Sequence, residues 1–298
     1  MITVSQPIDS ASVQEMVYAL RNRFRFLNTI PIGHSVLGKP IWALMLGDCR
    51  DRILYTAAFH AQEWITALVL LRLCENVCRA LATNTCLSGI DLRRALAGRG
   101  LTLIPLVNPD GVDIARHGSI TARSYENSVR ALGGDLAGRW QANVRGVDLN
   151  HNFAAGWHVL REQEIAAGIV GPAARRYGGP VPESEPETAA LTNLCRHTVF
   201  RHALALHTQG EEIYWRYGAH TPDRARLMAE IMAASSGYTV ADPTGLAAHG
   251  GFKDWFIYEC RRPAFTIEMG KGQNPLPIGE FEHIYAKAEE MLLLCALM

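Results

Sequence analysis

The sequence has 298 residues, of which 48% are hydrophobic and 19% are charged. A chain of this length can bury a hydrophobic core without the help of disulfides or a structural metal. The sequence contains no internal repeat or linker, so it predicts a single domain over residues 1–298. Its 29 Lys and Arg residues equal its 29 Asp and Glu residues in number. Because nucleic acids and membrane surfaces are bound through a basic field, the zero net charge argues against both kinds of partner.

The predicted elements alternate between helices and short apolar strands. In chain order, they are a helix at 10–27, strands at 41–46 and 52–58, a helix at 63–82, a strand at 101–107, a helix at 184–197, a strand at 201–206, helices at 221–236 and 251–260, a strand at 263–268 and a helix at 279–297. Residues 109–180 show little periodicity, so we expect a long functional loop region there. The alternation predicts an α/β fold with a mixed, mostly parallel central sheet and helices on both faces.

The seven cysteines are odd in number, and several lie in apolar helical stretches. No second pair joins Cys74 and Cys78 to complete a four-cysteine zinc site. We therefore expect reduced thiols and a reducing compartment. Residues 1–6 lack the basic and apolar regions of a secretory signal, which favours a cytoplasmic protein. Residues 64–82 are apolar but contain three charged residues, so they predict a buried helix and no membrane span.

Two short segments place histidines directly after predicted buried strands. His60 and Glu63 follow the apolar run at 53–59, and His207 follows the apolar run at 203–206. Two imidazoles and one carboxylate suit Zn²⁺ without any thiolate, and three protein ligands leave a fourth position open for catalysis. Each segment alone has a simpler interpretation, since His60 and Glu63 could cap the following helix and His207 could be a core or loop residue. Their combination predicts a catalytic zinc site.

Glu268 ends the predicted strand at 263–268 and precedes a turn at Gly270. The carboxyl ends of strands in α/β folds border the crevice in which ligands bind, so Glu268 is a candidate general base. The alternative interpretation is a surface charge that closes the strand.

These segments, with others in the same order, resemble the zinc metallocarboxypeptidase family of the carboxypeptidase A and B type. The similarity covers nearly the whole chain and rests on the turn and strand at 33–41, His60-x-x-Glu63-Trp64, the turn at 108–111, the segment at 146–153, Ser184-Glu185-x-Glu187, His207 and the Glu268 strand. The resemblance implies one Zn²⁺ per chain on His60, Glu63 and His207, with Glu268 as the catalytic base. The segments at 207–215 and 251–256 are similar to bacterial γ-D-glutamyl-diamino acid endopeptidases, which cut cell-wall stem peptides.

Some departures from the family pattern concern anion binding. The pair Asn150-His151 replaces the family's Asn-Arg pair, which holds the terminal carboxylate of a substrate, and His lacks the fixed donor fork of Arg. The family's oxyanion-binding Arg aligns with Gln141, and Arg139 or Arg145 could serve instead. The resemblance therefore implies a metal site of the family type and leaves the anion-binding groups open.

Two further departures concern specificity, and one residue concerns the metal site. Leu246 replaces the family's Tyr that closes over substrate, which puts ordinary carboxypeptidase activity in doubt. Lys253 stands at the base of the specificity pocket, where a cation would suit an acidic or zwitterionic group such as diaminopimelate; the alternative is a solvated surface Lys. Asp148 could orient a zinc-bound His, or could be a simple turn residue.

We therefore predict a zinc-dependent peptidase that hydrolyses cell-wall stem peptides at the γ-D-glutamyl–meso-diaminopimelate bond. The expected partner is a peptidoglycan-derived peptide, and no sequence feature predicts an oligomeric state. One alternative is a zinc carboxypeptidase or related amide hydrolase of another specificity, such as a deacylase. The other is an inactive protein that only binds cell-wall peptide, and the complete ligand set together with Glu268 argues against it.

Overall fold

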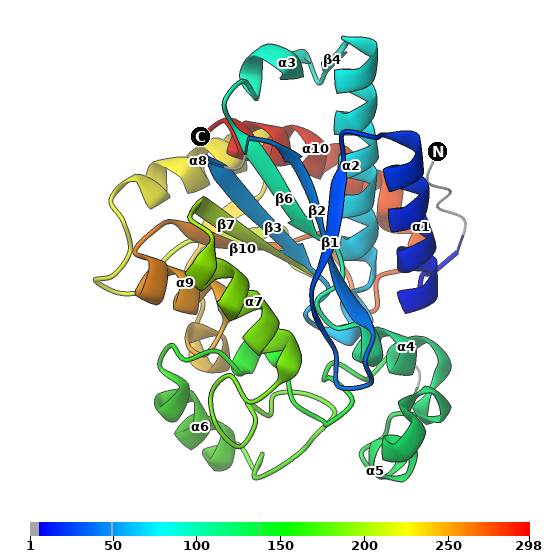
Figure 1. Ribbon diagram of the computed structural model, residues 1–298. Coiled ribbons are helices and arrows are strands. Elements are labelled where there is room, and N and C mark those ends of the chain that lie inside the picture. The colour runs from blue at the N-terminus through cyan, green and yellow to red at the C-terminus, as the bar shows by residue number, and fades with distance from the viewer. Residues whose placement is uncertain (1–5, 49, 137) are drawn as a thin grey trace.

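The computed structural model describes residues 6–48, 50–136 and 138–298, and its centre is an eight-stranded sheet (Figure 1). The strands are β1 (Asn28–His34), β2 (Pro40–Gly47), β3 (Arg52–Ala57), β6 (Gly100–Ile104), β7 (Phe200–His207), β8 (Glu212–Tyr214), β9 (Thr239–Ala241) and β10 (Ala264–Glu268). Their order across the sheet is β1-β2-β6-β3-β7-β10-β8-β9. β6, β3, β7 and β10 run parallel, whereas β2 and β8 join this central group antiparallel. The predicted mixed, mostly parallel sheet is confirmed.

Helices cover both faces of this sheet. One face is covered by α1 (Ser10–Arg23), α2 (Ile65–Thr83), α8 (Arg224–Ser236) and α10 (Phe281–Leu297), and the other by α7 (Pro186–His197) and α9 (Phe252–Cys260). Successive strand side chains alternate between the two cores, so Ile53 and Tyr55 pack with the first group of helices and Leu54 packs with the second. Because both faces of the central strands are covered, these strands are continuous apolar runs.

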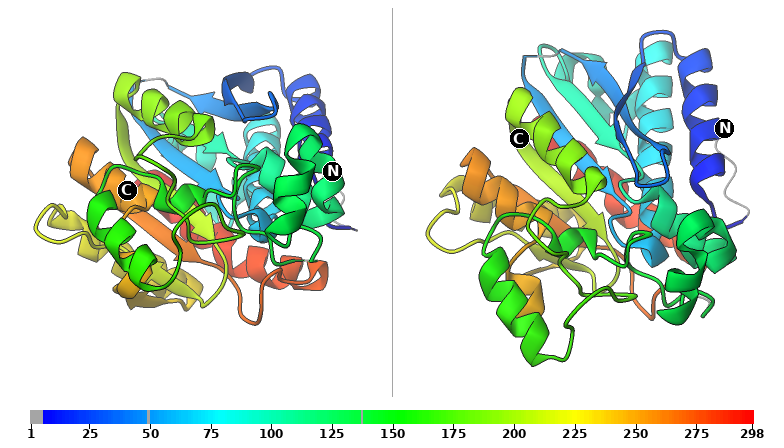
Figure 2. Two further views of the ribbon diagram at one scale, coloured as in Figure 1. Left: turned by 90° about the horizontal axis from the view of Figure 1, so that it is seen from below. Right: turned by 60° about the horizontal axis from the view of Figure 1, so that its bottom comes forward.

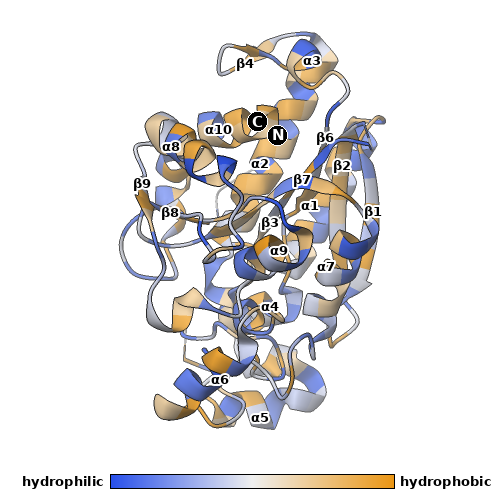
Figure 3. Cartoon of the chain, turned by 90° about the vertical axis from the view of Figure 1, so that its left-hand side faces the viewer, coloured by the Kyte–Doolittle hydropathy of each residue, from blue (hydrophilic) through white to orange (hydrophobic). Residues whose placement is uncertain are grey.

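Local signals set the ends of several helices. α1 begins after Asp9, whose carboxylate accepts a hydrogen bond from Ser12 N at 2.8 Å, and it ends at Arg23, short of the predicted end at 27. α2 ends at Thr83, and the following residue, Asn84, has a left-handed backbone. Pro186 occupies the first turn of α7, where its missing N–H has no helical partner to lose. Although α2 is largely hydrophobic (Figure 3), the described ranges contain no helix long and apolar enough to cross a membrane.

The prediction of a long loop over residues 109–180 is wrong. The segment contains α4 (Pro109–His117), α5 (Glu126–Ala131) and α6 (Trp157–Ala166), with the 3₁₀ helices η2 (Ser119–Tyr125) and η3 (Leu149–His151) between them. α5 spans too few residues to show a helical period, and α6 follows Gly156 without a side-chain cap, so neither start is marked in the sequence. Asn108 caps α4 by accepting a hydrogen bond from Gly111 N at 2.9 Å.

The prediction also missed the edges of the sheet. β1 is an edge strand with mostly exposed side chains, and its register shifts between Pro31 and Gly33, so it lacks a regular apolar pattern. β8 and β9 span three residues each. A separate hairpin pairs β4 (Cys86–Leu87) with β5 (Ile90–Asp91) before the short helix α3 (Leu92–Ala95). Strands this short carry too little sequence pattern to be recognised.

The parallel strands β3, β7 and β10 end at the same edge of the sheet. Glu268, the last residue of β10, is the register partner of His207, the last residue of β7. His60 lies shortly after β3 and directly before η1 (Ala61–Glu63). The segments between β6 and α7 gather at this edge, as the view from below shows (Figure 2). The predicted strand ends therefore meet next to the segments between β6 and α7.

Candidate active site

Three side chains from two strand ends converge on one point. His60 Nδ1 lies 2.9 Å from Glu63 Oε1, His207 Nδ1 lies 3.0 Å from Glu63 Oε2, and the two Nδ1 atoms lie 3.2 Å apart. Glu63 and His207 are buried. Ring nitrogens that face each other beside a buried carboxylate present more lone pairs than protons, and a divalent cation satisfies such a set. The three residues thus form a candidate metal site, and their donor types fit zinc.

The ionisable groups of this cluster shift one another's pKa values. Burial alone would raise the pKa of Glu63, but His60 and His207 outweigh it and lower that pKa to about 2. Burial alone would lower the pKa of His60, but the carboxylates of Glu63 and Asp148 outweigh it and raise that pKa. A metal ion that binds here must therefore displace a proton, as metal ligands generally require.

Asp148 holds His60 from the opposite side of the imidazole ring. Asp148 Oδ1 lies 3.2 Å from His60 Nε2, and its Oδ2 accepts hydrogen bonds from Gln141 Nε2 at 2.8 Å and Arg176 N at 3.0 Å. Burial would raise the pKa of Asp148, but His60 and His151 outweigh it and hold that pKa well below its usual range. A carboxylate at Nε2 leaves Nδ1 free for a metal, so this geometry suits an orienting role.

Two residues that the sequence analysis missed hold the other ligands. Asn274 Nδ2 lies 3.3 Å from Glu63 Oε1 and donates a hydrogen bond to Thr208 O at 2.8 Å. Phe59 stacks on His207, with ring centroids 5.4 Å apart and an interplanar angle of 14°. Phe59 could have been noticed as the residue before His60, whereas nothing in the local sequence marks Asn274.

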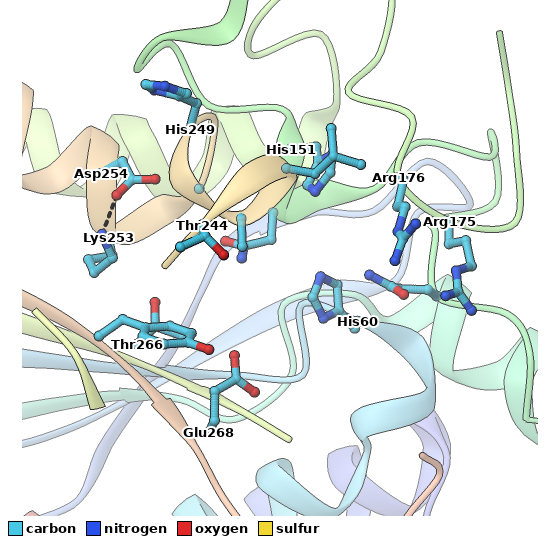
Figure 4. Close-up of a pocket in the computed structure, with 16 residues that line it drawn as sticks. His60, His151, Arg175, Arg176, Thr244, His249, Lys253, Asp254, Thr266 and Glu268 are labelled. Atoms are coloured by element: carbon cyan, nitrogen blue, oxygen red, sulfur yellow. Dashed lines mark hydrogen bonds and ion pairs between the residues drawn. The ribbon is translucent and has the colours of Figure 1, made fainter. Parts of the chain in front are cut away.

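Glu268 reaches the same region from β10 (Figure 4). Burial, followed by the negative charge of Glu63, raises the pKa of the Glu268 carboxyl well above its usual range. A carboxyl in this environment holds a proton readily, which a group that transfers protons needs. A divalent cation on the neighbouring ligands would lower this pKa again. The location suits a general base, and that role stays a prediction.

A cleft of about 390 Å³ lies beside these groups (Figure 4). Its lining includes the predicted residues Gln141, Asn150, His151, Leu246 and Lys253, together with His60 and Glu268. It also includes residues that the sequence analysis did not single out, namely Arg175, Arg176, Tyr214, Thr244, His249, Asp254 and Thr266. Arg139 and Arg145 are not among the described lining residues, and Arg145 instead lies 3.6 Å from Glu185. A role for either of these two arginines as the oxyanion donor stays a prediction.

His151 is held in the cleft by a buried acid. His151 Nδ1 lies 2.8 Å from Glu164 Oε1, and Glu164 Oε2 accepts a hydrogen bond from Arg161 at 2.6 Å. Glu164 belongs to α6, in the segment predicted as a loop, so the sequence did not indicate this partner. Asn150 Oδ1 accepts a hydrogen bond from Phe252 N at 3.0 Å, which ties the pair to the start of α9. The residue that replaces the family's Arg thus has a fixed orientation.

Lys253 lines the cleft as predicted, and the alternative of a solvated surface Lys is wrong. Its side chain is only 3% exposed, and its Nζ donates a hydrogen bond to Arg216 O at 2.8 Å and pairs with the Asp254 carboxylate. Burial raises the pKa of Asp254, and Lys253 opposes that rise. A substrate would therefore meet a Lys–Asp pair in place of a lone cation. Contact between Lys253 and substrate stays a prediction.

The sequence matches a known family over most of its length. The zinc carboxypeptidase family model matches residues 13–293, so the chain belongs to the zinc carboxypeptidase family and is a zinc metallopeptidase. Among its relatives is the gamma-D-glutamyl-L-diamino acid endopeptidase 1 of Lysinibacillus sphaericus. That protein is 37% identical over 290 residues, which cover 97% of this chain and 72% of the relative. The resemblance seen in the sequence motifs is confirmed.

Solved structures share the fold. Bovine thrombin-activatable fibrinolysis inhibitor, in complex with tick carboxypeptidase inhibitor, aligns with a TM-score of 0.77 at 21% identity, over 98% of this chain and 97% of that chain. The murein-tripeptide amidase MpaA of Escherichia coli O157 aligns with a TM-score of 0.53 at 19% identity, over 91% and 90% of the two chains. These alignments confirm the predicted fold, and the roles of individual residues stay predictions.

Proposed function

We propose that the protein hydrolyses the amide bond between γ-D-glutamate and meso-diaminopimelate in peptidoglycan stem peptides. The observation that carries this proposal is the buried Lys253–Asp254 pair in the lining of the cleft. The distal carbon of diaminopimelate bears an ammonium and a carboxylate, so it offers each member of the pair an opposite charge. A basic side chain would match only Asp254, and an apolar side chain would match neither residue of the pair. The name of the Lysinibacillus sphaericus relative supports the same class of substrate.

The catalytic groups suit amide hydrolysis. One Zn²⁺ held by His60, Glu63 and His207 would polarise the amide carbonyl and acidify a water molecule. Glu268 takes a proton from the water as the water oxygen bonds to the carbonyl carbon. The same carboxyl then gives this proton to the amine as the carbon–nitrogen bond breaks. Asp148 keeps the His60 ring oriented during both steps.

The remaining lining residues suit a charged leaving group. Asn150 and His151 reach the cleft at η3, where a family exopeptidase would place its Asn-Arg pair. A His held by Glu164 offers one N–H to a carboxylate, whereas Arg offers a fork of donors. Terminal carboxylate binding is therefore weaker here than in the family pattern, and the Lys253–Asp254 pair in the cleft contributes more to recognition. Gln141 remains the candidate donor to the oxyanion.

A comparison of three peptides tests this function. Zinc-loaded protein is incubated with L-Ala-γ-D-Glu-meso-diaminopimelate, with its L-lysine analogue, and with a plain C-terminal L-peptide, and the products are identified by mass spectrometry. We expect release of diaminopimelate, slower release of lysine because its distal carboxylate is missing, and an intact plain peptide. Comparable hydrolysis of the plain peptide would favour a zinc carboxypeptidase of other specificity. Binding without any hydrolysis would favour a peptide-binding protein.

We also propose that the protein works in a reducing compartment such as the cytoplasm. Cys74, Cys78, Cys195 and Cys295 are buried free thiols, Cys86 and Cys260 are also free, and Cys49 lies outside the described residues. Buried unpaired thiols suit a compartment that keeps cysteine reduced. Thiol titration of freshly isolated, denatured protein should find all seven cysteines free. Native disulfides would contradict this proposal.

A further inference from the structure

We propose that Arg175 and Arg176 form a second anion-binding subsite, which takes a carboxylate on the acyl side of the scissile bond. In the proposed substrate this group is the free α-carboxylate of the γ-linked D-glutamyl residue, so the inference rests on the proposed function. None of the predicted motifs includes these two residues.

The two guanidinium groups are available to a ligand. Arg175 and Arg176 are exposed and line the cleft. Within the described ranges neither side chain forms an ion pair or a hydrogen bond. Lys253, which also lines the cleft and carries a positive charge, is paired with Asp254. An anion that enters the cleft is therefore attracted to the arginines more strongly than to the lysine.

The backbone that carries these arginines is fixed although their side chains are free. Ala174 O accepts a hydrogen bond from Gln141 N at 2.9 Å, and Tyr177 O accepts one from Asp148 N at 2.7 Å. Arg176 N donates to Asp148 Oδ2 at 3.0 Å, and Asp148 also contacts the first predicted zinc ligand. Arg176 has a φ of 67°, which is uncommon for a residue with a Cβ atom. The two side chains thus extend from a backbone that is tied closely to the metal site.

The position of the arginines assigns them to the acyl side. In Figure 4 they lie on the far side of His60 from the Lys253–Asp254 pair. A substrate whose diamino acid lies at this pair, and whose amide lies near His60, must extend its acyl part toward the arginines.

The chemistry of a γ-linkage matches this position. The acyl residue of a γ-glutamyl substrate carries a carboxylate a few carbon atoms from the scissile carbonyl, whereas an α-linked peptide has one there only if its acyl residue is itself acidic. Guanidinium groups bind carboxylates through charge-assisted hydrogen bonds in a fixed planar geometry. A subsite formed by Arg175 and Arg176 would therefore distinguish γ-D-glutamyl substrates from peptides whose acyl residue is neutral or basic.

Two matched peptides test the subsite. One is L-Ala-γ-D-Glu-meso-diaminopimelate, and the other carries D-isoglutamine, which replaces only the α-carboxylate by a carboxamide. Calorimetry measures their binding to the zinc-loaded Glu268→Gln protein, in which turnover should be about 10²–10⁴-fold slower. We expect the acid peptide to bind roughly 10- to 100-fold more tightly than the amide peptide, as a charge-assisted hydrogen bond implies.

Arginine variants show whether the subsite causes this preference. Changing Arg175→Gln and Arg176→Gln together should bring the affinities of the two peptides to within about a factor of two. Arg94→Gln makes the same kind of charge change in an exposed residue of α3, which lies at the opposite end of the strands from the cleft (Figure 1). This control should keep the full preference. Circular dichroism and thermal melting should confirm that all variants fold.

The outcomes separate this inference from the proposed function. Equal affinity for the two peptides, or no measurable binding of either, overturns the subsite even if wild-type protein cleaves the γ-glutamyl bond. A preference for the acid peptide that persists in the double arginine variant also overturns the subsite. If the kcat of that variant with an intact Glu268 falls equally for both peptides, the arginines act on the oxyanion instead. A preference that depends on the arginines supports the subsite even if cleavage occurs at another bond, and then only the proposed function fails.

Discussion

Glu187 gives the protein a pH-dependent stability that can be worked out from the structure. Its carboxyl is fully buried, and it accepts hydrogen bonds from Val36 N at 3.1 Å and Asn143 Nδ2 at 3.3 Å. Burial raises the pKa of Glu187 from 4.5 to about 7, and the charges of Asp110 and Glu185 add to the rise. The unfolded chain therefore loses this proton at a lower pH than the folded protein does.

The sign and size of the effect follow from this difference. The stability that comes from the neutral carboxyl is fully present below pH 4.5 and is lost as the pH rises through about 7. At about 1.4 kcal/mol for each pKa unit, the shift corresponds to roughly 3 kcal/mol of unfolding free energy. Glu187→Gln cannot titrate, so the variant should gain about this much relative to wild type as the pH rises from about 4.5 to about 8.

Urea denaturation over that pH range measures the effect. Wild type and Glu187→Gln are compared in the same metal state, so that metal binding contributes equally to both unfolding free energies. Glu290→Gln removes a carboxyl from an exposed position and serves as the control, for which we expect a flat difference. A difference between wild type and Glu187→Gln that stays constant with pH would refute the reasoning, as would one that changes in favour of wild type.

Three further changes test the catalytic site. His207→Ala should lose zinc by elemental analysis, and a variant that keeps stoichiometric metal would contradict the proposed ligand set. Glu268→Gln should lower kcat by about 10²–10⁴-fold with zinc content and melting temperature unchanged, and near-normal turnover would exclude Glu268 as the base. Lys253→Met should raise KM for the diaminopimelate peptide more than for a neutral amide, and should cost about 3–5 kcal/mol of stability because Asp254 is left buried and unpaired. Adding Asp254→Asn should restore much of that stability, and an equal rise in KM on both substrates would leave Lys253 with a structural role alone.

The convergence of the candidate metal ligands could be predicted because each stands in a fixed relation to a buried strand. In a parallel sheet the carboxyl ends of β3, β7 and β10 share an edge. Residues at or just after these ends therefore lie close together, independently of the conformation of the loops. His207 and Glu268 are register partners in adjacent strands, and one 3₁₀ turn brings Glu63 back to His60. The same apolar runs indicate the fold class, because strands buried on both faces need helices on both sides.

The arginines of the cleft could not be predicted in this way. Nearness to Gln141 in the sequence favours Arg139 and Arg145, but distance along an irregular segment does not determine where a side chain points. Arg175 and Arg176 reach the cleft because backbone hydrogen bonds tie their segment to the chain around Gln141. Contacts between segments that are distant in the sequence leave no local pattern, and the same holds for the placement of α4, α5 and α6.

The Lys253–Asp254 pair changes what the family resemblance implies about specificity. Adjacent residues on a helix do not face each other as a rule, so the sequence alone predicts a lone cation at Lys253. At the start of α9 the two side chains instead meet in a buried ion pair, which weakens the attraction of the lysine for a simple anion. His151 replaces the strong donor fork of the family's Arg, and in the described part of the chain the unpaired guanidinium groups of the cleft belong to Arg175 and Arg176, on the other side of His60 in Figure 4. The cleft therefore has a Lys–Asp pair on one side of His60 and unpaired guanidinium groups on the other, and a substrate with charged groups on both sides of its amide would match this arrangement better than one with a single terminal carboxylate.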